Sequence, residues 1–316
     1  MQKRRLGQSD IEVSVVGVGC NNFGRRIHDI AVARAVVHRA IDLGITLFDT
    51  ADAYGNGKSE SFLGDSLGAR RPEVVIATKF GMGSPGGASR RTIMRTVEVS
   101  LKRLRTDWID LYQVHFPDPN TSIEETLRAL DDLVRQGKVR QIGCSNHSAQ
   151  QVDDAQAVSR KHGLARFVTS QDEYSLLVRG IERDRVPAMH RHGMTLLPYA
   201  PLAGGFLTGK YQRGKPLPSN ARLAYSSHHA SDVINDRNWN MVERLRGFAT
   251  KTRRSMLELA FAWLLSHSVT ASVIAGASTP EQVEANAKAA GWTLSAADLA
   301  EIDRITIDAS PPLKPK

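Results

Sequence analysis

The chain has 316 residues, of which 41% are hydrophobic and 24% charged, as in an ordinary soluble globular protein. No apolar run approaches the length of about 18 residues that suggests a membrane span, and the basic start precedes no apolar stretch of the kind found in secretory signals. The formal charge of +9 comes from lysines and arginines interleaved with acids, which favours a solvated basic surface over a nucleic-acid footprint. Cys20 and Cys144 are too few for a disulfide framework and indicate a reducing cytoplasm.

Short apolar runs alternate with amphipathic stretches along most of the chain. Near the start, residues 3–6 and 11–13 flank a Gly-Gln-Ser-Asp turn and predict a hairpin placed to plug a barrel floor. Eight later runs predict strands at 15–19, 46–49, 74–79, 109–115, 139–144, 167–171, 195–199 and 272–275. Eight strands with crossover helices close a barrel more readily than they form an open sheet. The predicted fold is therefore an α/β (β/α)8 TIM barrel, one domain over residues 1–316.

Helix signals lie between the predicted strands. Asp29 is the expected cap of a helix with an apolar face of Val32, Val36, Ala40 and Leu43. Ser122 begins another helix and stands three residues before Glu125, the spacing of a capping box. Between the seventh and eighth strands the chain is too long for one helix. Its pattern predicts a loop at 211–237 and two extra helices, at 238–250 and 255–267. A long loop at the catalytic rim is usually a lid or a specificity loop.

Four polar residues lie at or just beyond the ends of three successive predicted strands: Asp49, Tyr54, Lys79 and His115. Because barrel active sites lie at the carboxyl rim of the strands, we expect these side chains to meet there. Hydride reduction of a carbonyl puts negative charge on its oxygen, and a nearby group must donate a proton to it. Tyr54 would be that donor if a neighbouring ammonium lowers the pKa of its phenol from about 10.

Lys79 is the candidate ammonium, and Asp49 would keep it charged and oriented. His115 would donate a hydrogen bond near the developing oxyanion. Taken singly, each residue has an ordinary structural interpretation, such as a surface lysine or a strand-end histidine. Their joint placement at strand ends favours proton-coupled hydride transfer. The set contains no nucleophile with an adjacent base and no metal-ligand spacing, so no metal is predicted.

These motifs, in their order along the chain, resemble the aldo-keto reductase superfamily over essentially the whole length. The similarity lies in Phe48-Asp-Thr-Ala-Asp-Ala-Tyr54-Gly55, Ala77-Thr-Lys79-Phe80, Leu111-Tyr-Gln-Val-His115, Ile142-Gly-Cys-Ser145-Asn146 and the segment from Gln171 to Arg179. The segment from Pro198 to Tyr211 is similar to the branch that includes bacterial reductases and potassium-channel beta subunits. The resemblance implies a TIM barrel that uses NADPH, with a tetrad matching Asp49, Tyr54, Lys79 and His115.

The resemblance also implies cofactor contacts at specific positions. The nicotinamide would be held by Ser145, Asn146 and Gln171, with Tyr199 stacked on its ring. The pyrophosphate would be lined by Pro201, Leu202, Gly204, Thr208 and Lys210. The adenosine phosphate end would be held by Gly276, Ser278, Gln282 and Asn286. Independently of the resemblance, Pro280 suits the first turn of a helix whose free N–H groups attract an anion; a plain helix capped by Thr279 or Ser278 explains the segment equally well.

This chain departs from the better-known branches of the family at the adenosine end. Their basic contacts to the 2′-phosphate align with Gly276 and Gln282, and an acidic adenine contact aligns with Ala285. NADPH is the expected cofactor, and NADH is not excluded. Arg222, on the long loop, is hypothesised to replace the lost positive charge. An Arg222→Ala change that left the cofactor preference untouched would count against this hypothesis.

The substrate side is expected to be apolar, because Phe23, Phe80 and Phe116 follow three strands at the rim. The predicted function is NADPH-dependent reduction of aldehydes or ketones to alcohols, with Tyr54 as proton donor. The alternatives are oxidation of a polyol or sugar alcohol at the same site, and a cofactor-binding regulatory or redox-sensor subunit with little turnover. The expected partner is a small carbonyl compound, with no nucleic acid and no membrane. Substrate identity, direction in the cell and oligomeric state do not follow from the sequence.

Overall fold

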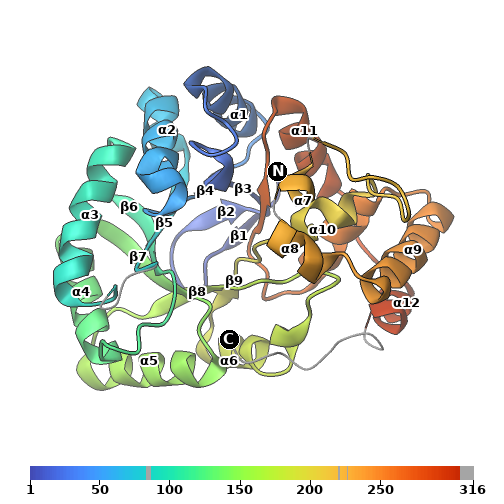
Figure 1. Ribbon diagram of the computed structural model, residues 1–316. Helices are drawn as coiled ribbons and strands as arrows, with labels where there is room; N and C mark the ends of the chain where they lie inside the picture. Colours follow the sequence, from blue (N-terminus) through green and yellow to red (C-terminus); the bar gives the residue numbers. More distant parts are fainter. Residues whose placement is uncertain (83–86, 220, 226, 307–316) are drawn as a thin grey trace.

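The computed structural model describes residues 1–82, 87–219, 221–225 and 227–306 (Figure 1). Within these residues, eight parallel strands form a sheet in the order β10-β3-β4-β5-β6-β7-β8-β9. Their bounds are β3 Val16–Gly19, β4 Leu47–Asp49, β5 Val75–Phe80, β6 Ile109–Val114, β7 Val139–Ser145, β8 Phe167–Gln171, β9 Thr195–Leu196 and β10 Val273–Gly276. A parallel bridge between Leu196 and Thr270 joins the two edges of the sheet. The predicted (β/α)8 barrel is confirmed.

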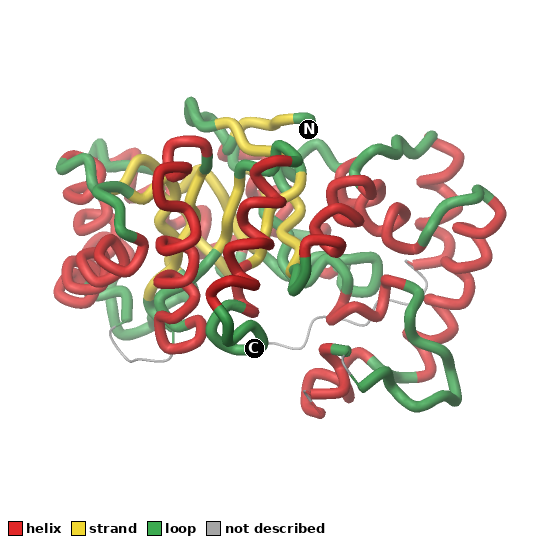
Figure 2. The backbone as a smooth tube through the Cα atoms, turned by 90° about the horizontal axis from the view of Figure 1, so that it is seen from above, coloured by secondary structure: helices red, strands yellow, loops and turns green. Residues whose placement is uncertain are grey.

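The predicted N-terminal hairpin is also present. Strands β1 (Lys3–Arg5) and β2 (Glu12–Ser14) pair antiparallel, and Figure 2 shows them at one end of the barrel strands. Leu6, Ile11 and Val13 are buried in one apolar cluster with side chains of the barrel interior, such as Leu47 and Leu111. The hairpin therefore covers the barrel floor, the end opposite the carboxyl rim of the strands.

Helices cover the outside of the barrel (Figure 1). The helices between consecutive barrel strands, up to the seventh, are α1 Ile30–Asp42, α2 Lys58–Leu67, α3 Arg90–Leu104, α4 Ile123–Arg135, α5 Ala149–His162 and α6 Arg185–His192. After β10 follow α11 Pro280–Ala289 and α12 Ala296–Thr306. No helix among the described residues is both long and apolar enough to cross a membrane.

The segment between β9 and β10 contains α7 Arg222–Tyr225, α8 Ser227–Val233, α9 Asp236–Lys251 and α10 Met256–Ser266. The last two confirm the predicted extra helices. The expectation of a plain loop over 211–237 is wrong in part, because α7 and α8 lie within it. These short helices are held by tertiary burial, since Leu223 is 1% exposed and Val233 is 9% exposed.

Three local predictions need correction. Asp29 caps α1 as expected, but Val32 is 39% exposed, because the buried stripe runs through Ala33, Val36, Val37, Ala40 and Ile41. Ser122 accepts the N–H of Glu125, yet the Glu125 carboxylate accepts the Arg90 N–H at 2.9 Å, so the capping box is only half formed. The seventh strand is also shorter than predicted and ends at Leu196.

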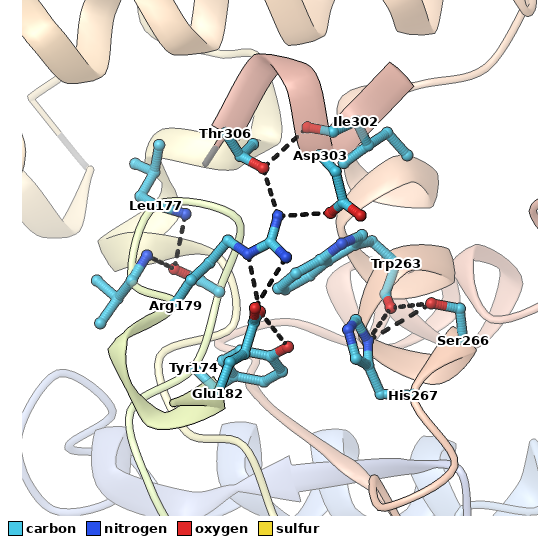
Figure 3. A network of polar contacts seen from close by, with 12 residues as sticks. Tyr174, Leu177, Arg179, Glu182, Trp263, Ser266, His267, Ile302, Asp303 and Thr306 are labelled. Atoms are coloured by element: carbon cyan, nitrogen blue, oxygen red, sulfur yellow. Dashed lines mark hydrogen bonds and ion pairs between the residues drawn. The ribbon is translucent and has the colours of Figure 1, made fainter. Parts of the chain in front are cut away.

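Arg179 connects α12 to the segment that follows β8 (Figure 3). Its Nη1 donates to Asp303 Oδ1 at 2.7 Å and to Thr306 Oγ1 on α12. Its Nε and Nη2 donate to the carboxylate of Glu182 at 2.7 and 2.9 Å. The guanidinium also lies 5.0 Å from the ring centroid of Trp263 on α10. One buried arginine thus joins three segments that are distant in sequence.

Candidate active site

A cavity of about 750 Å³ opens at the carboxyl ends of the barrel strands. Its lining extends from Asp49, Tyr54 and His115, past Tyr199, to the start of α11 near Ser278. Binding sites for small molecules commonly have volumes of about 300–1,000 Å³, and barrel enzymes place their active sites at this rim. The cavity therefore has the size and position of a ligand site.

Lys79 lies behind the cavity wall and is fully buried. Its Nζ donates to both carboxylate oxygens of Asp49, at 2.7 and 2.8 Å, and to the backbone oxygen of Thr50 at 2.9 Å. Burial alone would lower the pKa of Lys79, but the Asp49 carboxylate and Tyr54 outweigh burial and raise it. Lys79 is therefore held as an ammonium ion at neutral pH.

Tyr54 begins the 3-10 helix η2 (Tyr54–Gly57) and lines the cavity. Lys79 Nζ lies 5.1 Å from the centroid of its ring. The ring of His115 meets it edge-on, with centroids 5.7 Å apart. The chain turns away at once after Tyr54, because the next three residues have left-handed backbone angles, with φ between 55° and 86°. The structure thus brings together the four residues that the strand ends predicted.

His115 follows β6 and is 6% exposed. Burial, and then the positive charge of Lys79, lower the pKa of His115 to about 3. Its imidazole is therefore neutral at ordinary pH and has one N–H to donate. Its Nδ1 is buried and has no hydrogen-bond partner among the described residues. The imidazole stacks on Phe116, with centroids 5.0 Å apart.

A chain of hydrogen bonds links Asp49 to Tyr199 along the cavity wall. Gln171 Nε2 donates to Asp49 Oδ1 at 2.8 Å, and the backbone oxygen of Gln171 accepts from Ser145 Oγ at 2.8 Å. Asn146 Nδ2 donates to Ser145 Oγ at 3.0 Å, and Tyr199 donates its phenol to Asn146 Oδ1 at 2.9 Å. All five line the cavity. The predicted nicotinamide contacts thus form one connected wall next to the tetrad.

The segment after β9 follows an unusual backbone path along the cavity. The predicted contacts on this segment all line the cavity: Pro201, Leu202, Gly204, Thr208 and Lys210. Ala200, Ala203, Gly204 and Gly205 have φ values of 49°, 46°, 67° and 96°. A Cβ on Gly205 would lie 3.1 Å from Lys210 Nζ, so glycine gives this lysine room beside the turn.

Three cations line the cavity: Arg26, Lys210 and Arg222. Burial, and then Arg26, lower the pKa of Lys210, while burial and the charges of Arg25 and Arg26 lower the pKa of Arg222. Mutual repulsion of this kind is relieved by an anionic ligand. The site therefore fits a cofactor that carries phosphate groups. The sequence analysis missed Arg26, for which the only signal was a basic pair just before the first predicted helix.

The far end of the cavity is formed by the start of α11. The predicted contacts Gly276, Ser278, Gln282 and Asn286 all line it, and so does Ala285. Thr279 caps the helix by accepting the Gln282 N–H, which decides between the two expected caps. Asn22, which the sequence analysis missed, donates to Ser278 Oγ at 3.2 Å. The described contacts of this end are neutral, so it offers hydrogen bonds rather than a cation to a ligand.

The expected aromatic wall is mostly absent. Phe116 lines the cavity and is 37% exposed, but Phe23 and Phe80 are fully buried and do not line it. Side chains alternate across a strand, and Phe80 follows the inward-facing Lys79, so it packs instead on Tyr112 at a centroid distance of 4.6 Å. Met82, which the sequence analysis did not identify, is 48% exposed and supplies apolar lining at the mouth.

The chain is similar to known proteins over most of its length. Residues 15–307 match the aldo/keto reductase family. A probable voltage-gated potassium channel subunit beta from Arabidopsis thaliana is 35% identical over 92% of this chain and 91% of its own length. Aldo-keto reductase YhdN from Bacillus subtilis is 34% identical over 96% of this chain and 93% of its own length. Probable aldo-keto reductase 1 from Glycine max is 34% identical over 96% of this chain and 88% of its own length. The chain therefore belongs to the aldo/keto reductase family.

Proposed function

We propose that this protein is an NADPH-dependent reductase that converts aldehydes or ketones to alcohols, with Tyr54 as the proton donor. The observation that carries the proposal is the buried ion pair of Lys79 and Asp49 directly behind Tyr54, at the base of a cavity lined by cations. Membership of the family supports oxidoreductase chemistry at this site.

The side chains have distinct tasks in this proposal. The nicotinamide cofactor supplies the hydride when bound. Tyr54 gives its proton to the carbonyl oxygen, and the Lys79 ammonium stabilises the phenolate that remains. His115, neutral because of its lowered pKa, donates its N–H to the same oxygen and orients the carbonyl. Asp49 keeps Lys79 charged and directed toward Tyr54.

The cofactor contacts proposed here follow the cavity lining. Ser145, Asn146 and Gln171 would hold the nicotinamide amide, and Tyr199 would stack on its ring. The pyrophosphate would lie along the turn from Pro201 to Lys210, and the adenosine end at α11. Because that end offers only neutral contacts, Arg222 supplies the charge that favours NADPH over NADH. Phe116 and Met82 would form the apolar wall for the substrate.

The test is a nicotinamide-absorbance assay over aldehydes, ketones and sugars, with NADPH and with NADH. Tyr54→Phe should lower kcat by about 10²–10⁴-fold and leave the cofactor Kd unchanged, because it removes only the proton donor. Tyr112→Phe is the matched control, since its buried hydroxyl has no partner among the described residues and it does not line the cavity. Turnover that survives in Tyr54→Phe would remove Tyr54 from this role.

A second candidate function is favoured by one comparison. The Arabidopsis relative is named as a channel subunit beta, so a cofactor-binding regulatory subunit with little turnover is the alternative. Tight NADPH binding without turnover over the whole panel would support it. Turnover with a sugar alcohol and the oxidised cofactor would instead show that the same site works in the oxidative direction. Both cysteines are free and buried, which suits the cytoplasm that we propose as its compartment.

Arg222→Ala tests the proposed source of cofactor preference. Loss of its charge should weaken NADPH binding more than NADH binding, because only NADPH carries the 2′-phosphate. The ratio of the two Kd values, measured by quenching of protein fluorescence, reports this directly. An unchanged ratio would show that the neutral contacts at α11 set the preference.

A further inference from the structure

Glu60 is a buried carboxylate that lies outside the cavity lining. It sits on α2, is 0% exposed, and accepts a hydrogen bond from Thr78 Oγ1 at 2.7 Å. Thr78 directly precedes Lys79 on β5. The other carboxylate oxygen of Glu60 accepts from Arg103 Nη1 at 3.3 Å. Glu60 therefore joins the strand that carries Lys79 to a cation from another helix.

Arg103 extends from α3 to the loop that carries Tyr54. Its Nη1 donates to the backbone oxygen of Asp52 at 3.4 Å. On the other side of Tyr54, its guanidinium occupies the space beside Gly57, where an added Cβ would lie 2.1 Å from the guanidinium carbon. Asp52 in turn donates its N–H to the backbone oxygen of Lys79 at 3.1 Å. The guanidinium thus contacts the loop on both sides of Tyr54.

The backbone of the loop is unusual at one position, Asn56. Gly55, Asn56 and Gly57 all have left-handed angles, and Asn56 adopts φ of 55° without being glycine. Sparsely populated backbone conformations persist only where the surrounding structure holds them. Near Gly55 the turn passes close to another segment, since a Cβ added there would lie 3.1 Å from the backbone oxygen of Phe23 and 3.2 Å from that of Gly24.

We propose that Arg103 and Glu60 are positioning residues, which hold the Tyr54 loop against the strand of Lys79 and so set the placement of the phenol beside the ammonium. This inference rests on the proposed function. Neither residue touches the cavity, so both act through the loop. A displacement of about 1 Å at a reacting group can cost about 10²-fold in rate, so loss of the support should reach kcat.

Charge balance explains why both members of the pair are needed. A buried carboxylate without a cation is strongly disfavoured. A second carboxyl group lies close by: burial and then the charge of Glu60 raise the pKa of Asp52 to about 6, and Arg103 opposes this shift. Removing Arg103 therefore leaves Glu60 without its cation and removes one of the positive charges that oppose the raised pKa of Asp52.

The experiment compares Arg103→Met, Arg103→Lys and the parent protein, with Arg95→Met as the matched control. Arg95 is exposed on the same helix, so its replacement makes the same charge change away from the loop. We measure kcat, KM and the NADPH Kd on protein shown to be folded. Arg103→Met should lower kcat at least about tenfold with the cofactor Kd within about twofold, and Arg103→Lys should recover most of the loss. Arg95→Met should match the parent.

Glu60→Gln is the second variant, because it keeps an oxygen to accept from Thr78 and removes only the charge that binds Arg103. It should lower kcat in the same way, and it tests the pair if Arg103→Met does not fold. Parental kcat in folded Arg103→Met or Glu60→Gln, beside turnover that depends on Tyr54, would overturn this inference alone. A parent protein without turnover would overturn the proposed function, and this inference with it. A loss of kcat and NADPH binding together would indicate general disruption and would also overturn it.

Discussion

Lys79 and Asp49 form an ion pair in which neither side chain is more than 4% exposed. Replacing one partner leaves the other charge buried without compensation, which typically costs about 3–5 kcal/mol. Lys79→Met should therefore reduce the free energy of unfolding by about that amount, measured by urea denaturation at pH 7 with circular dichroism. The double variant Asp49→Asn with Lys79→Met should regain part of this loss, because no isolated charge remains. A double variant less stable than Lys79→Met would contradict this account of the pair.

Buried histidines should make the protein sensitive to mild acid. Burial lowers the pKa of His147 to about 4, and that of His115 to about 3, from an ordinary value of 6.5. Between pH 6.5 and about 4 the unfolded chain therefore binds protons that the folded chain does not. Stability from these groups is complete above pH 6.5 and falls as the pH falls, by up to about 1.4 kcal/mol per pH unit for each histidine.

His147→Asn isolates this effect away from the tetrad. The Nδ1 of His147 is 2.9 Å from the backbone oxygen of Ser145, a contact that an asparagine amide reproduces without titrating. Urea denaturation at pH 7.0, 6.0 and 5.0 should show a shallower decline for the variant than for the parent. If the free energy of unfolding declined equally in both proteins, folding would not lower the pKa of His147.

Gly64 and Gly247 both lie in helices but differ in the space that an added Cβ would find. A Cβ on Gly64 of α2 would lie 2.6 Å from backbone atoms of Arg103 and Leu104 at the end of α3. Gly64→Ala should therefore destabilise the protein by about 1–3 kcal/mol through overpacking. Gly247 of α9 has no described atom within 4 Å of its added Cβ, so Gly247→Ala should stabilise by about 0.5–1 kcal/mol through helix propensity. Thermal denaturation of the two variants should give Tm changes of opposite sign.

Arg179 should contribute strongly to the attachment of α12. Its side chain is 7% exposed and binds Glu182, Asp303 and Thr306, so Arg179→Met should cost about 2–3 kcal/mol. Hydrogen exchange measured by mass spectrometry should show faster exchange in α12 of the variant. Arg183→Met is the control: Arg183 is 71% exposed in a 3.8 Å pair with Asp184, and such pairs contribute at most about 1 kcal/mol. Equal losses of stability in the two variants would show that Arg179 contributes no more than an exposed arginine.

The rim residues could be predicted because each stands at the end of an apolar run with strand character. Strand order alone then brings Asp49, Lys79 and His115 to one place. The same rule misplaced Phe80, although alternation along β5 puts it on the face opposite to Lys79. Parity along the strand, used together with strand order, would have excluded Phe80 from the cavity wall.

Other features depend on contacts that no local pattern encodes. Arg103 and Glu60 are 43 positions apart, and their meeting depends on how α2 and α3 pack. The helices α7 and α8 are too short for a periodic signal and exist because Leu223 and Val233 find buried positions. Arg26 belongs to no motif in the sequence, and only the fold brings it to the cavity that Lys210 and Arg222 also line.

Of the eight barrel strands β9 is the shortest, since it contains only Thr195 and Leu196, and it pairs with the segment before β10 through the bridge of Leu196 with Thr270. The turn that follows β9 and the helix that follows β10 both line the cavity. A dinucleotide bound across both segments would link the two sides of this closure. If the proposed cofactor binds there, the melting temperature should rise with the logarithm of its concentration above its Kd, because the ligand binds the folded chain and not the unfolded one.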